Sequence, residues 1–383
     1  MVKMLNAFTS EIDDVDIAVS EILSQLKIDE NLLTNSIGIV ACSGDFIETG
    51  VLKAICDRLP FSTIGMETSA SMAAGECGQL ILTVSVISSD DSTFISAISD
   101  ELDDSEEKIM AFCRNASNNF DKEPKMIFAL CPFNIESAVN AETIFNIIND
   151  SYPNIPVFGG TAGAADDCNT HKRIIFNGDA FNNRIVLAAF CGKIEPKFIC
   201  RDISMNKIVR ENGLVTQSDK NIICGINNIK FDEFLLKLGI SRALLKEHIY
   251  MIPFWFDFNG RNEPISRAVF EITQDGCGIC SGNIPTGITM ALGKYRKKDV
   301  LDTAGKFFED SCKHGKLNGV FILSCFGRFL SLEADFNSEM KLLQELFGET
   351  PFHLVYSAGE YLSMETNEKE RNWHSFSIMG FCF

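Results

Sequence analysis

The chain of 383 residues has few histidines, tryptophans and tyrosines, and it has no long apolar run. A membrane-spanning helix needs about 18 consecutive apolar residues, and no window of the sequence approaches that length without charge. The start, MVKMLNAFTSEIDD, reaches acidic residues before an apolar signal-peptide core can form. These absences predict a cytoplasmic protein with no membrane partner.

Basic residues are also scarce relative to acidic ones. The chain has 34 Lys and Arg against 52 Asp and Glu, which gives a formal net charge of -18 at pH 7. A balance of this sign repels phosphate backbones, and the most basic stretch, KYRKKD at 294–299, is short. The composition therefore argues against nucleic acid as a partner.

Cysteine, in contrast, is abundant, with 14 in the chain. Many cysteines lie in apolar runs and are interpreted as small apolar residues in a reducing compartment. These are Cys56, Cys131, Cys191, Cys224 and Cys382. The spacing of Cys277 and Cys280 fits a redox pair or half of a zinc site. No second pair or suitably spaced histidine follows, and the surroundings predict a Gly-rich hairpin, so a packing role is favoured for both.

Three segments of the chain share one pattern. Each has an apolar strand that ends at a cysteine, then a helix, then a short strand that runs into a Ser/Thr-rich or Gly-rich turn. The strand-end cysteines and their matching turn residues are Cys42 with Thr68, Cys131 with Thr161, and Cys325 with Ser357. A further strand-like run follows each turn. The pattern predicts repeated β-α-β-β units in an α/β (α+β) fold, with mixed sheets covered by helices and two related halves.

Clear periodicity is lost between about 195 and 230, which places a domain boundary near residue 200. The predicted domains are 1–200 and 201–383. The second domain opens with a helical pattern at 230–240 and with strand patterns at 249–258 and 268–276.

The turn VFGGTAGAADD, which begins at Val157, is the richest in glycine. Glycines let the backbone approach a ligand closely, and exposed N–H groups can bind an anion. The sequence matches neither a dinucleotide fingerprint nor a P-loop. A small-ligand loop and a tight structural turn remain equal interpretations.

The stretch FILSCFGRFL carries two candidates for chemistry, Cys325 and Arg328. A nucleophilic cysteine needs a nearby base, for which His374 is a candidate, but the recurrence of strand-end cysteines favours packing. Arg328 needs an acidic partner, either Glu339 or Glu360. Arg328, Glu360 and the turn N–H groups would suit a ligand with both a carboxylate and an amine. A buried structural ion pair is an equal alternative.

Six motifs occur in the order typical of FIST-domain proteins. They are VFGGTAG, SGNIPTGITMAL, SCFGR, a Glu in the following helix, YSAGE and WHSFS. The chain resembles this family from about residue 37 to its end. The resemblance implies a FIST N-terminal module (1–200) and a FIST C-terminal module (201–383) that sense a small ligand such as an amino acid. Without a fused output domain, the signal is expected to pass to a separate protein, such as a histidine kinase or a cyclic-dinucleotide enzyme.

The family's motif positions carry over to a set of candidate ligand-binding residues, to which Ser357 is added as the strand end within YSAGE. The set is Gly159, Gly160, Thr161, Cys325, Arg328, Glu339, Ser357, Gly359, Glu360 and His374. Some similar family members bind haem and sense nitric oxide, so haem with His374 as axial ligand is an alternative. A cysteine-dependent enzyme and a purely structural subunit are further alternatives.

Two motifs depart from the family pattern. The first-half turn, GMETSAS, lacks the second Gly and the final Glu that the family commonly has. Ser375 and Phe376 follow His374 where the family usually has Asn and a variable residue. The first departure weakens the case for a ligand role of the N-terminal turn. The second keeps a histidine but changes its neighbours.

Overall fold

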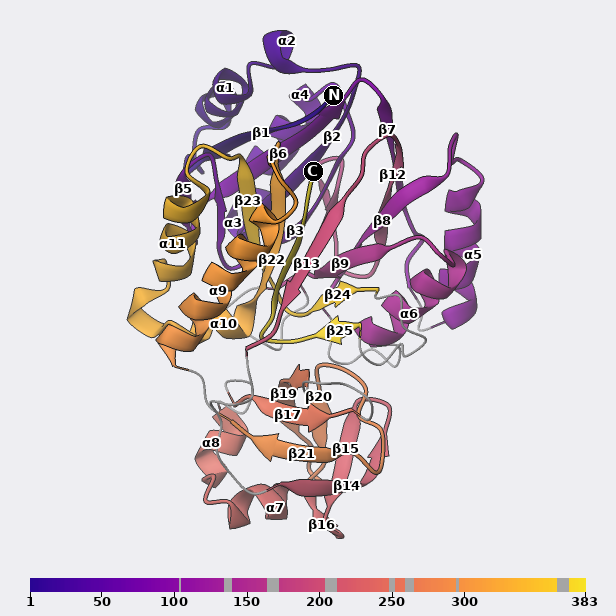
Figure 1. The fold of residues 1–383 in the computed structure, drawn as a ribbon, viewed down its shortest axis with the longest axis vertical. Helices are drawn as coiled ribbons and strands as arrows, with labels where there is room; N and C mark the ends of the chain where they lie inside the picture. Colours follow the sequence, from indigo (N-terminus) through magenta and orange to yellow (C-terminus); the bar gives the residue numbers. More distant parts are fainter. Residues whose placement is uncertain are drawn as a thin grey trace.

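A computed structural model of the chain shows four β-sheets among the residues that it describes. Three six-stranded sheets pack together in the upper part of Figure 1, and an eight-stranded sheet lies below them. The described residues are 1–102, 105–133, 140–163, 172–203, 212–247, 252–258, 265–293, 296–363 and 372–383. Within them, no helix is both long enough and apolar enough to cross a membrane.

The three six-stranded sheets share one strand order. Sheet 1 runs β1 (Val2–Thr9), β6 (Leu82–Ser89), β2 (Asn35–Cys42), β3 (Thr63–Glu67), β10 (Ile174–Phe176), β11 (Asp179–Phe181). Sheet 2 runs β7 (Ser92–Ile98), β12 (Val186–Gly192), β8 (Pro124–Cys131), β9 (Val157–Thr161), β24 (Glu360–Leu362), β25 (Trp373–His374). Sheet 3 runs β13 (Lys197–Arg201), β26 (Ile378–Cys382), β22 (Val320–Cys325), β23 (Phe352–Ser357), β4 (Ser71–Ala73), β5 (Glu76–Gly78).

Each of these sheets holds one of the repeated units. The third and fourth strands are parallel in every case: β2 with β3, β8 with β9, and β22 with β23. The last strand of each unit pairs antiparallel with the first strand of that parallel pair. The predicted α+β fold with mixed sheets is therefore confirmed. The internal relation holds among three sheets rather than between two halves.

Short hairpins are exchanged among the three sheets in a ring. The hairpin after β3, formed by β4 and β5, pairs with β23 of sheet 3. The hairpin after β9, formed by β10 and β11, pairs with β3 of sheet 1. The hairpin after β23, formed by β24 and β25, pairs with β9 of sheet 2. Strands from both sides of residue 200 consequently share sheets 2 and 3.

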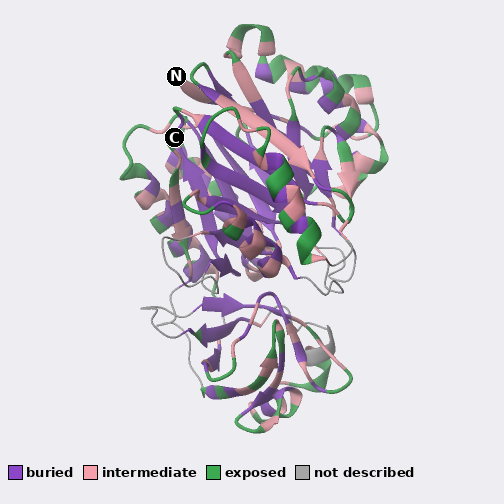
Figure 2. Cartoon of the chain, turned by 90° about the vertical axis from the view of Figure 1, so that its right-hand side faces the viewer, coloured by how far each residue is buried: buried purple, intermediate pink, exposed green. Residues whose placement is uncertain are grey.

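The inner faces of the three sheets meet in one apolar core. The ring of Phe128 in β8 lies 5.2 Å from that of Phe321 in β22, and Ile39 of β2 belongs to the same cluster. Alternate residues of these strands, such as Val40 and Ile127, face outward and pack against helices. Figure 2 shows these buried strands through the upper part of the molecule.

Helices cover the outer faces of the sheets (Figure 1). The helices of the first unit are α1 (Val15–Leu26), α2 (Ile28–Asn31), α3 (Gly44–Glu48) and α4 (Val51–Arg58). Those of the second are α5 (Glu106–Ser117) and α6 (Ala141–Ser151). Those of the third are α9 (Lys297–Cys312), α10 (Phe326–Ser331) and α11 (Ser338–Phe347), with a 3-10 turn at Glu333–Asp335. Each unit thus has a helix before and after its first parallel strand.

Local sequence explains where several helices begin and end. The side chain of Asp14 caps α1 by accepting from the N–H groups of Asp16 and Ile17. Asn140 caps α6 by accepting from the Thr143 N–H at 2.9 Å. Gly50, with a φ of 80°, divides the first predicted helix into α3 and α4.

The fourth sheet is inserted between β13 and α9. Its strands, in order, are β18 (Ile265–Arg267), β17 (Phe254–Asp257), β21 (Thr289–Leu292), β14 (Gly213–Asp219), β15 (Ile222–Ile226), β20 (Gly278–Cys280) and β19 (Val269–Ile272), with β16 (Ile229–Lys230) paired to β15. Its helices are α7 (Phe231–Lys237) and α8 (Arg242–Glu247). The region near 195–230 therefore contains strands that its weak periodicity did not reveal.

A disulfide within this sheet corrects the cysteine interpretation. Cys224 of β15 is bonded to Cys277, which comes directly before β20. From the sequence, both cysteines were interpreted as small packing residues, and the possible partner of Cys277 was Cys280. Cys280 instead is a buried free thiol, so the C-x-x-C spacing does not form a pair.

The strand ends of the three units match at positions slightly different from those predicted. The backbone N–H groups of Glu67, Thr161 and Tyr356 each donate to a carbonyl of the incoming hairpin, at 2.8, 3.0 and 3.2 Å. These three residues therefore occupy equivalent positions at the end of the second parallel strand in the three units. The predicted markers Thr68 and Ser357 each lie one residue too far along the chain.

The same shift applies to the cysteine at the end of the third strand. Cys42 lies opposite Glu67, and Cys131 lies opposite Thr161, but Tyr356 has Ser324 opposite. Cys325 is the next residue, so its side chain points to the other face of the sheet. The prediction that a cysteine recurs at one position in all three units is wrong for the third.

Two glycines lead to opposite predictions. A Cβ on Gly159 of β9 would lie 1.9 Å from the carbonyl oxygen of Ala129 in β8, so Gly159→Ala should destabilise the protein by about 3 kcal/mol. Gly305, inside α9, has open space around its Cα, so Gly305→Ala should stabilise it by about 0.5–1 kcal/mol. Urea unfolding measures both changes in stability. If Gly159→Ala also stabilised the protein, the close contact between β9 and β8 would be contradicted.

Candidate functional site

The predicted site residues lie in three separate places of the fold. The first group, between sheet 3 and its helices, is Arg328 and Glu339. The second, on the inner face of the β24–β25 hairpin and beside it, is Gly160, Cys325, Ser357, Glu360 and His374. The third, on the outer face of sheet 2, is Gly159, Thr161 and Gly359. Residues 164–167 of the Gly-rich turn lie outside the described residues.

Arg328 and Glu339 form a fully buried ion pair. The Arg328 Nε donates to Glu339 Oε1 at 3.1 Å, and its Nη2 donates to Glu339 and, at 3.0 Å, to the Val300 carbonyl. Glu339 Oε2 accepts from the hydroxyls of Ser324 and Tyr356, both at 2.9 Å. Of the two acidic partners considered from the sequence, Glu339 is the one that binds Arg328. The geometry is that of a structural pair that joins β22 to α10 and α11.

Glu360 is buried among hydroxyl groups. Its two carboxyl oxygens accept from Ser357 Oγ at 2.6 Å and from Ser377 Oγ at 2.7 Å. Burial raises the pKa of Glu360 to about 8, although the two hydrogen bonds act in the opposite direction. The folded protein therefore holds this carboxyl mainly in its neutral form at pH 7.

The surroundings of Cys325 are unfavourable for a nucleophile. Burial, and next the nearby Glu360, raise the pKa of the Cys325 thiol well above its usual value. The reactive form of cysteine is the thiolate, and a protonated thiol is a weak nucleophile. The residue that the sequence offered as its base, His374, binds Asp202 instead.

The His374 ring lies inside the protein, with 1% of its surface exposed. Its Nδ1 lies 3.0 Å from Asp202 Oδ1 and 3.9 Å from Cys200 Sγ. An axial haem ligand must border a space as wide as the macrocycle. Because protein covers the ring on all sides and Asp202 holds its Nδ1, the described surroundings of His374 do not fit a haem.

A cavity of about 40 Å³ lies between sheet 2 and the fourth sheet. A single buried water needs ~10–15 Å³ measured in this way, so the space exceeds that of one water. Thr161 at the end of β9 and Trp373 of β25 line it from the core. Phe270 and Ser281 line it from the fourth sheet. The cavity thus lies where two separately packed parts of the chain meet.

Two buried polar atoms at this cavity have no hydrogen-bond partner among the described residues. They are Thr161 Oγ1 and Trp373 Nε1, which belong to residues that line the cavity, and each of these residues is 1% exposed. An unsatisfied buried donor costs free energy, so such groups in a native fold call for a partner. The N-terminus of α6 adds to them, because Asn140, Ala141 and Ile144 also line the cavity. Two donors and the positive end of a helix dipole favour an oxygen with negative charge.

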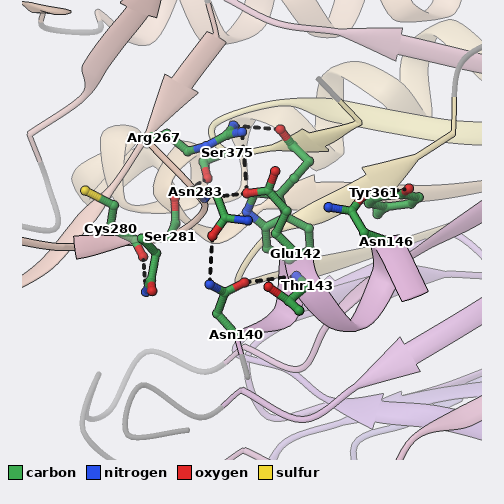
Figure 3. A network of polar contacts seen from close by, with 12 residues as sticks. Asn140, Glu142, Thr143, Asn146, Arg267, Cys280, Ser281, Asn283, Tyr361 and Ser375 are labelled. Carbon is green, nitrogen blue, oxygen red and sulfur yellow. Dashed lines mark hydrogen bonds and ion pairs between the residues drawn. The ribbon is translucent and has the colours of Figure 1, made fainter. Parts of the chain in front are cut away.

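A polar network connects α6 to the fourth sheet next to this cavity (Figure 3). Glu142 forms a buried ion pair with Arg267 at 3.8 Å and accepts from the Asn283 N–H. Arg267 Nη1 donates to the Trp373 carbonyl at 2.6 Å. Asn140 Nδ2 donates to Asn283 Oδ1 at 2.9 Å. These contacts hold the fourth sheet against the cap of α6, at one wall of the cavity.

Sequence reasoning selected Thr161 but missed the other polar residues of this region. Asn140, Glu142 and Arg267 belong to no motif that was recognised. One signal was present, because the motif SGNIPTGITMAL contains Ser281 and Asn283, which both contact the core. The motif was used to identify the family but not as part of a site.

The architecture defines an α+β protein of three interlocked repeat units with a fourth sheet inserted into the third. A FIST N domain model matches residues 36–229, and a FIST C domain model matches residues 225–363. The chain therefore belongs to the FIST family, whose domains are sensory domains of signal transduction. No curated protein matches the sequence significantly.

Proposed function

We propose that this chain is a cytoplasmic sensor of an amino acid or a similar small carboxylate. The ligand binds in the cavity between sheet 2 and the fourth sheet, and the signal passes to a separate protein, such as a histidine kinase or a cyclic-dinucleotide enzyme. The FIST N-terminal module comprises 1–200 and the FIST C-terminal module 201–383. The observation that carries the proposal is the pair of unpartnered groups, Thr161 Oγ1 and Trp373 Nε1, beside the N-terminus of α6.

The lining supports a ligand with a carboxylate and an apolar part. The Thr161 hydroxyl and the Trp373 N–H are both able to donate a hydrogen bond to a ligand, and hydrogen bonds to an ionised oxygen are stronger than those to a neutral one. The rings of Phe133 and Phe270, whose centroids are 5.1 Å apart, supply an apolar wall. The described lining residues carry no charged side chain, so the helix dipole and the two donors provide the complementary potential.

The position of the cavity suggests how binding is converted to a signal. Phe133 and Thr161 belong to the core, whereas Phe270 and Ser281 belong to the fourth sheet. A ligand that contacts both parts favours the arrangement in which they are closed around it. The fourth sheet, attached to the core through the chain on either side of it, is the part that a partner protein would sense.

The test is binding of amino acids to the purified chain, by thermal shift and then by calorimetry. Thr161→Val keeps the shape of the side chain but removes the donor, and it should weaken binding about tenfold or more. Thr63→Val is the matched control, because Thr63 is also 1% exposed but lies in β3, outside the cavity lining. It should leave affinity unchanged.

The carboxylate is tested with esters of the amino acid that binds best. The ester should bind more weakly than the free acid, because it cannot present an ionised oxygen to the two donors. If no amino acid or small carboxylate stabilises the chain, or if Thr161→Val binds as the unmodified chain does, the proposal is wrong.

A further inference from the structure

Three side chains of different chemistry meet on the inner side of β25, away from the ligand cavity. Cys200 lies in β13, Asp202 follows β13, and His374 lies in β25, far away in sequence. The Cys200 Sγ, an Asp202 carboxylate oxygen and a His374 ring nitrogen all lie within 4.8 Å of one another. From the sequence, His374 was considered only as an axial haem ligand, and neither Cys200 nor Asp202 was selected as a ligand.

The distances are close to those of a tetrahedral metal site. Zinc binds sulfur at about 2.3 Å and nitrogen or oxygen at about 2.0–2.2 Å, which separates tetrahedral ligand atoms by roughly 3.3–3.6 Å. His374 Nδ1 lies 3.0 Å from Asp202 Oδ1 and 3.9 Å from Cys200 Sγ. The Cys200 Sγ and an Asp202 carboxylate oxygen lie within 4.8 Å of each other, so the three side chains would have to adjust around an ion.

The positions of the three residues also meet the other needs of a metal site. His374 is 1% exposed and is therefore held in place, whereas 15% of the Asp202 side chain is exposed, which gives an ion a path from solvent. Cys200 and Asp202 are two apart at the end of β13, so a strand-like backbone directs both to one side.

We infer that Cys200, Asp202 and His374 form a binding site for Zn²⁺. A thiolate, an imidazole and a carboxylate are the three ligand types that zinc accepts, whereas Mg²⁺ and Ca²⁺ prefer oxygen alone. Three protein ligands leave the fourth tetrahedral position for water or for another ligand. Binding releases the thiol proton to solvent, because the cysteine ligand must be a thiolate. The inference is independent of the amino-acid cavity.

The site joins elements that meet only in the finished fold. Cys200 and Asp202 come with β13 at the edge of sheet 3, and His374 comes with the hairpin that completes sheet 2. An ion held by all three would tie these two sheets together. Zinc should therefore raise the melting temperature of the chain in proportion to the logarithm of its free concentration above the dissociation constant.

The experiment uses the full chain with its Cys224–Cys277 disulfide intact, freed of metal with a chelator. Titration with Co²⁺, a spectroscopic substitute for Zn²⁺, should saturate at one ion per chain and give a thiolate-to-cobalt charge-transfer band. Zn²⁺ should displace the Co²⁺ and remove the band. Saturation without such a band, or no saturation, would overturn the inference.

Variants assign the ligands. Cys200→Ser should remove the charge-transfer band, and Asp202→Asn should weaken Zn²⁺ affinity by at least tenfold. Cys312→Ser is the control, because Cys312 is an exposed free cysteine outside the cluster, and it should keep both the band and the affinity. A band of full strength in Cys200→Ser would assign the thiolate elsewhere and refute the site.

A second measurement needs no variant and so does not depend on whether each one folds. Bound Zn²⁺ should slow alkylation of Cys200 in the unmodified chain, as read by mass spectrometry of its peptides, while alkylation of Cys312 continues at its metal-free rate. Equal rates at Cys200 with and without Zn²⁺ would overturn the inference. An amino acid that binds the cavity gives no protection of this kind, which separates the two proposals.

Discussion

Glu339→Gln should lower the free energy of unfolding by about 3–5 kcal/mol, because it leaves a buried guanidinium without its counter-charge. Arg328 and Glu339 are both 0% exposed, and the carboxylate also accepts from Ser324 and Tyr356. Water cannot reach the site to compensate the charge of Arg328. Urea unfolding at pH 7, followed by far-ultraviolet circular dichroism, measures the loss.

An exposed pair in the same protein gives the control. Glu48 binds Arg173, but the Glu48 side chain is 71% exposed, so Glu48→Gln should cost at most about 1 kcal/mol. The two substitutions make the same chemical change in different surroundings. Equal losses in both variants would show that breaking the buried Arg328–Glu339 pair costs no more than breaking an exposed pair, and they would contradict the prediction.

The free energy of unfolding of the unmodified chain, compared with that of the Glu360→Gln variant, should fall as the pH rises from about 5 to 8. The expected fall is about 1.4 kcal/mol for each pH unit. The folded pKa of Glu360 is raised to about 8 from 4.5. In this range the unfolded chain has lost the Glu360 proton while the folded chain keeps it, so unfolding releases a proton and becomes easier as the pH rises. The contribution of Glu360 is fully present below pH 4.5 and is lost as the pH passes through 8.

Urea unfolding of both chains at each pH provides the comparison, since Glu360→Gln keeps the side-chain shape and removes only the titration. Other titrating groups affect both chains equally and cancel in the difference. Stability curves that run parallel from pH 5 to pH 8 would mean that Glu360 is already ionised in the folded chain, and they would contradict the assignment of a neutral buried carboxyl.

The local parts of the fold could be predicted because local sequence determines them. The third unit shows this clearly, where Met340, Leu343 and Phe347 form the apolar face of α11 and Gly348 ends it. The parallel strand pairs on either side of such helices follow from apolar runs and from the short distance between them. Helix α7 and strands β17 and β19 were found in the same way.

The hairpin exchange could not be predicted, because it depends on contacts between residues far apart in the chain. Met72 of β4 pairs with Leu354 of β23, and neither sequence contains a signal for the other. The strand-end error at Cys325 has a local cause. Helix α10 starts at Phe326, directly after β22, so the sequence has no loop that marks where the strand ends.

The candidate site was predicted in part for the same reason. Thr161 was selected because it lies in a glycine-rich motif, and its backbone contact with Gly359 brings the two motifs together. The choice between Glu339 and Glu360 as partner of Arg328 needed the register of β22 with β23. Trp373 lies within a family motif, but its place at the cavity depends on the exchanged hairpin.

The ring of exchanged hairpins also determines when this fold can be completed during translation. The β4–β5 hairpin is made early, but β23, the strand on which it rests, is made long after it. Until then β9 has an open edge as well, since β24 comes later still. Open edges and long-range pairings make nascent chains slow to fold and prone to association. The N-terminal half is therefore expected to depend on chaperones until β23 and β24 have been made.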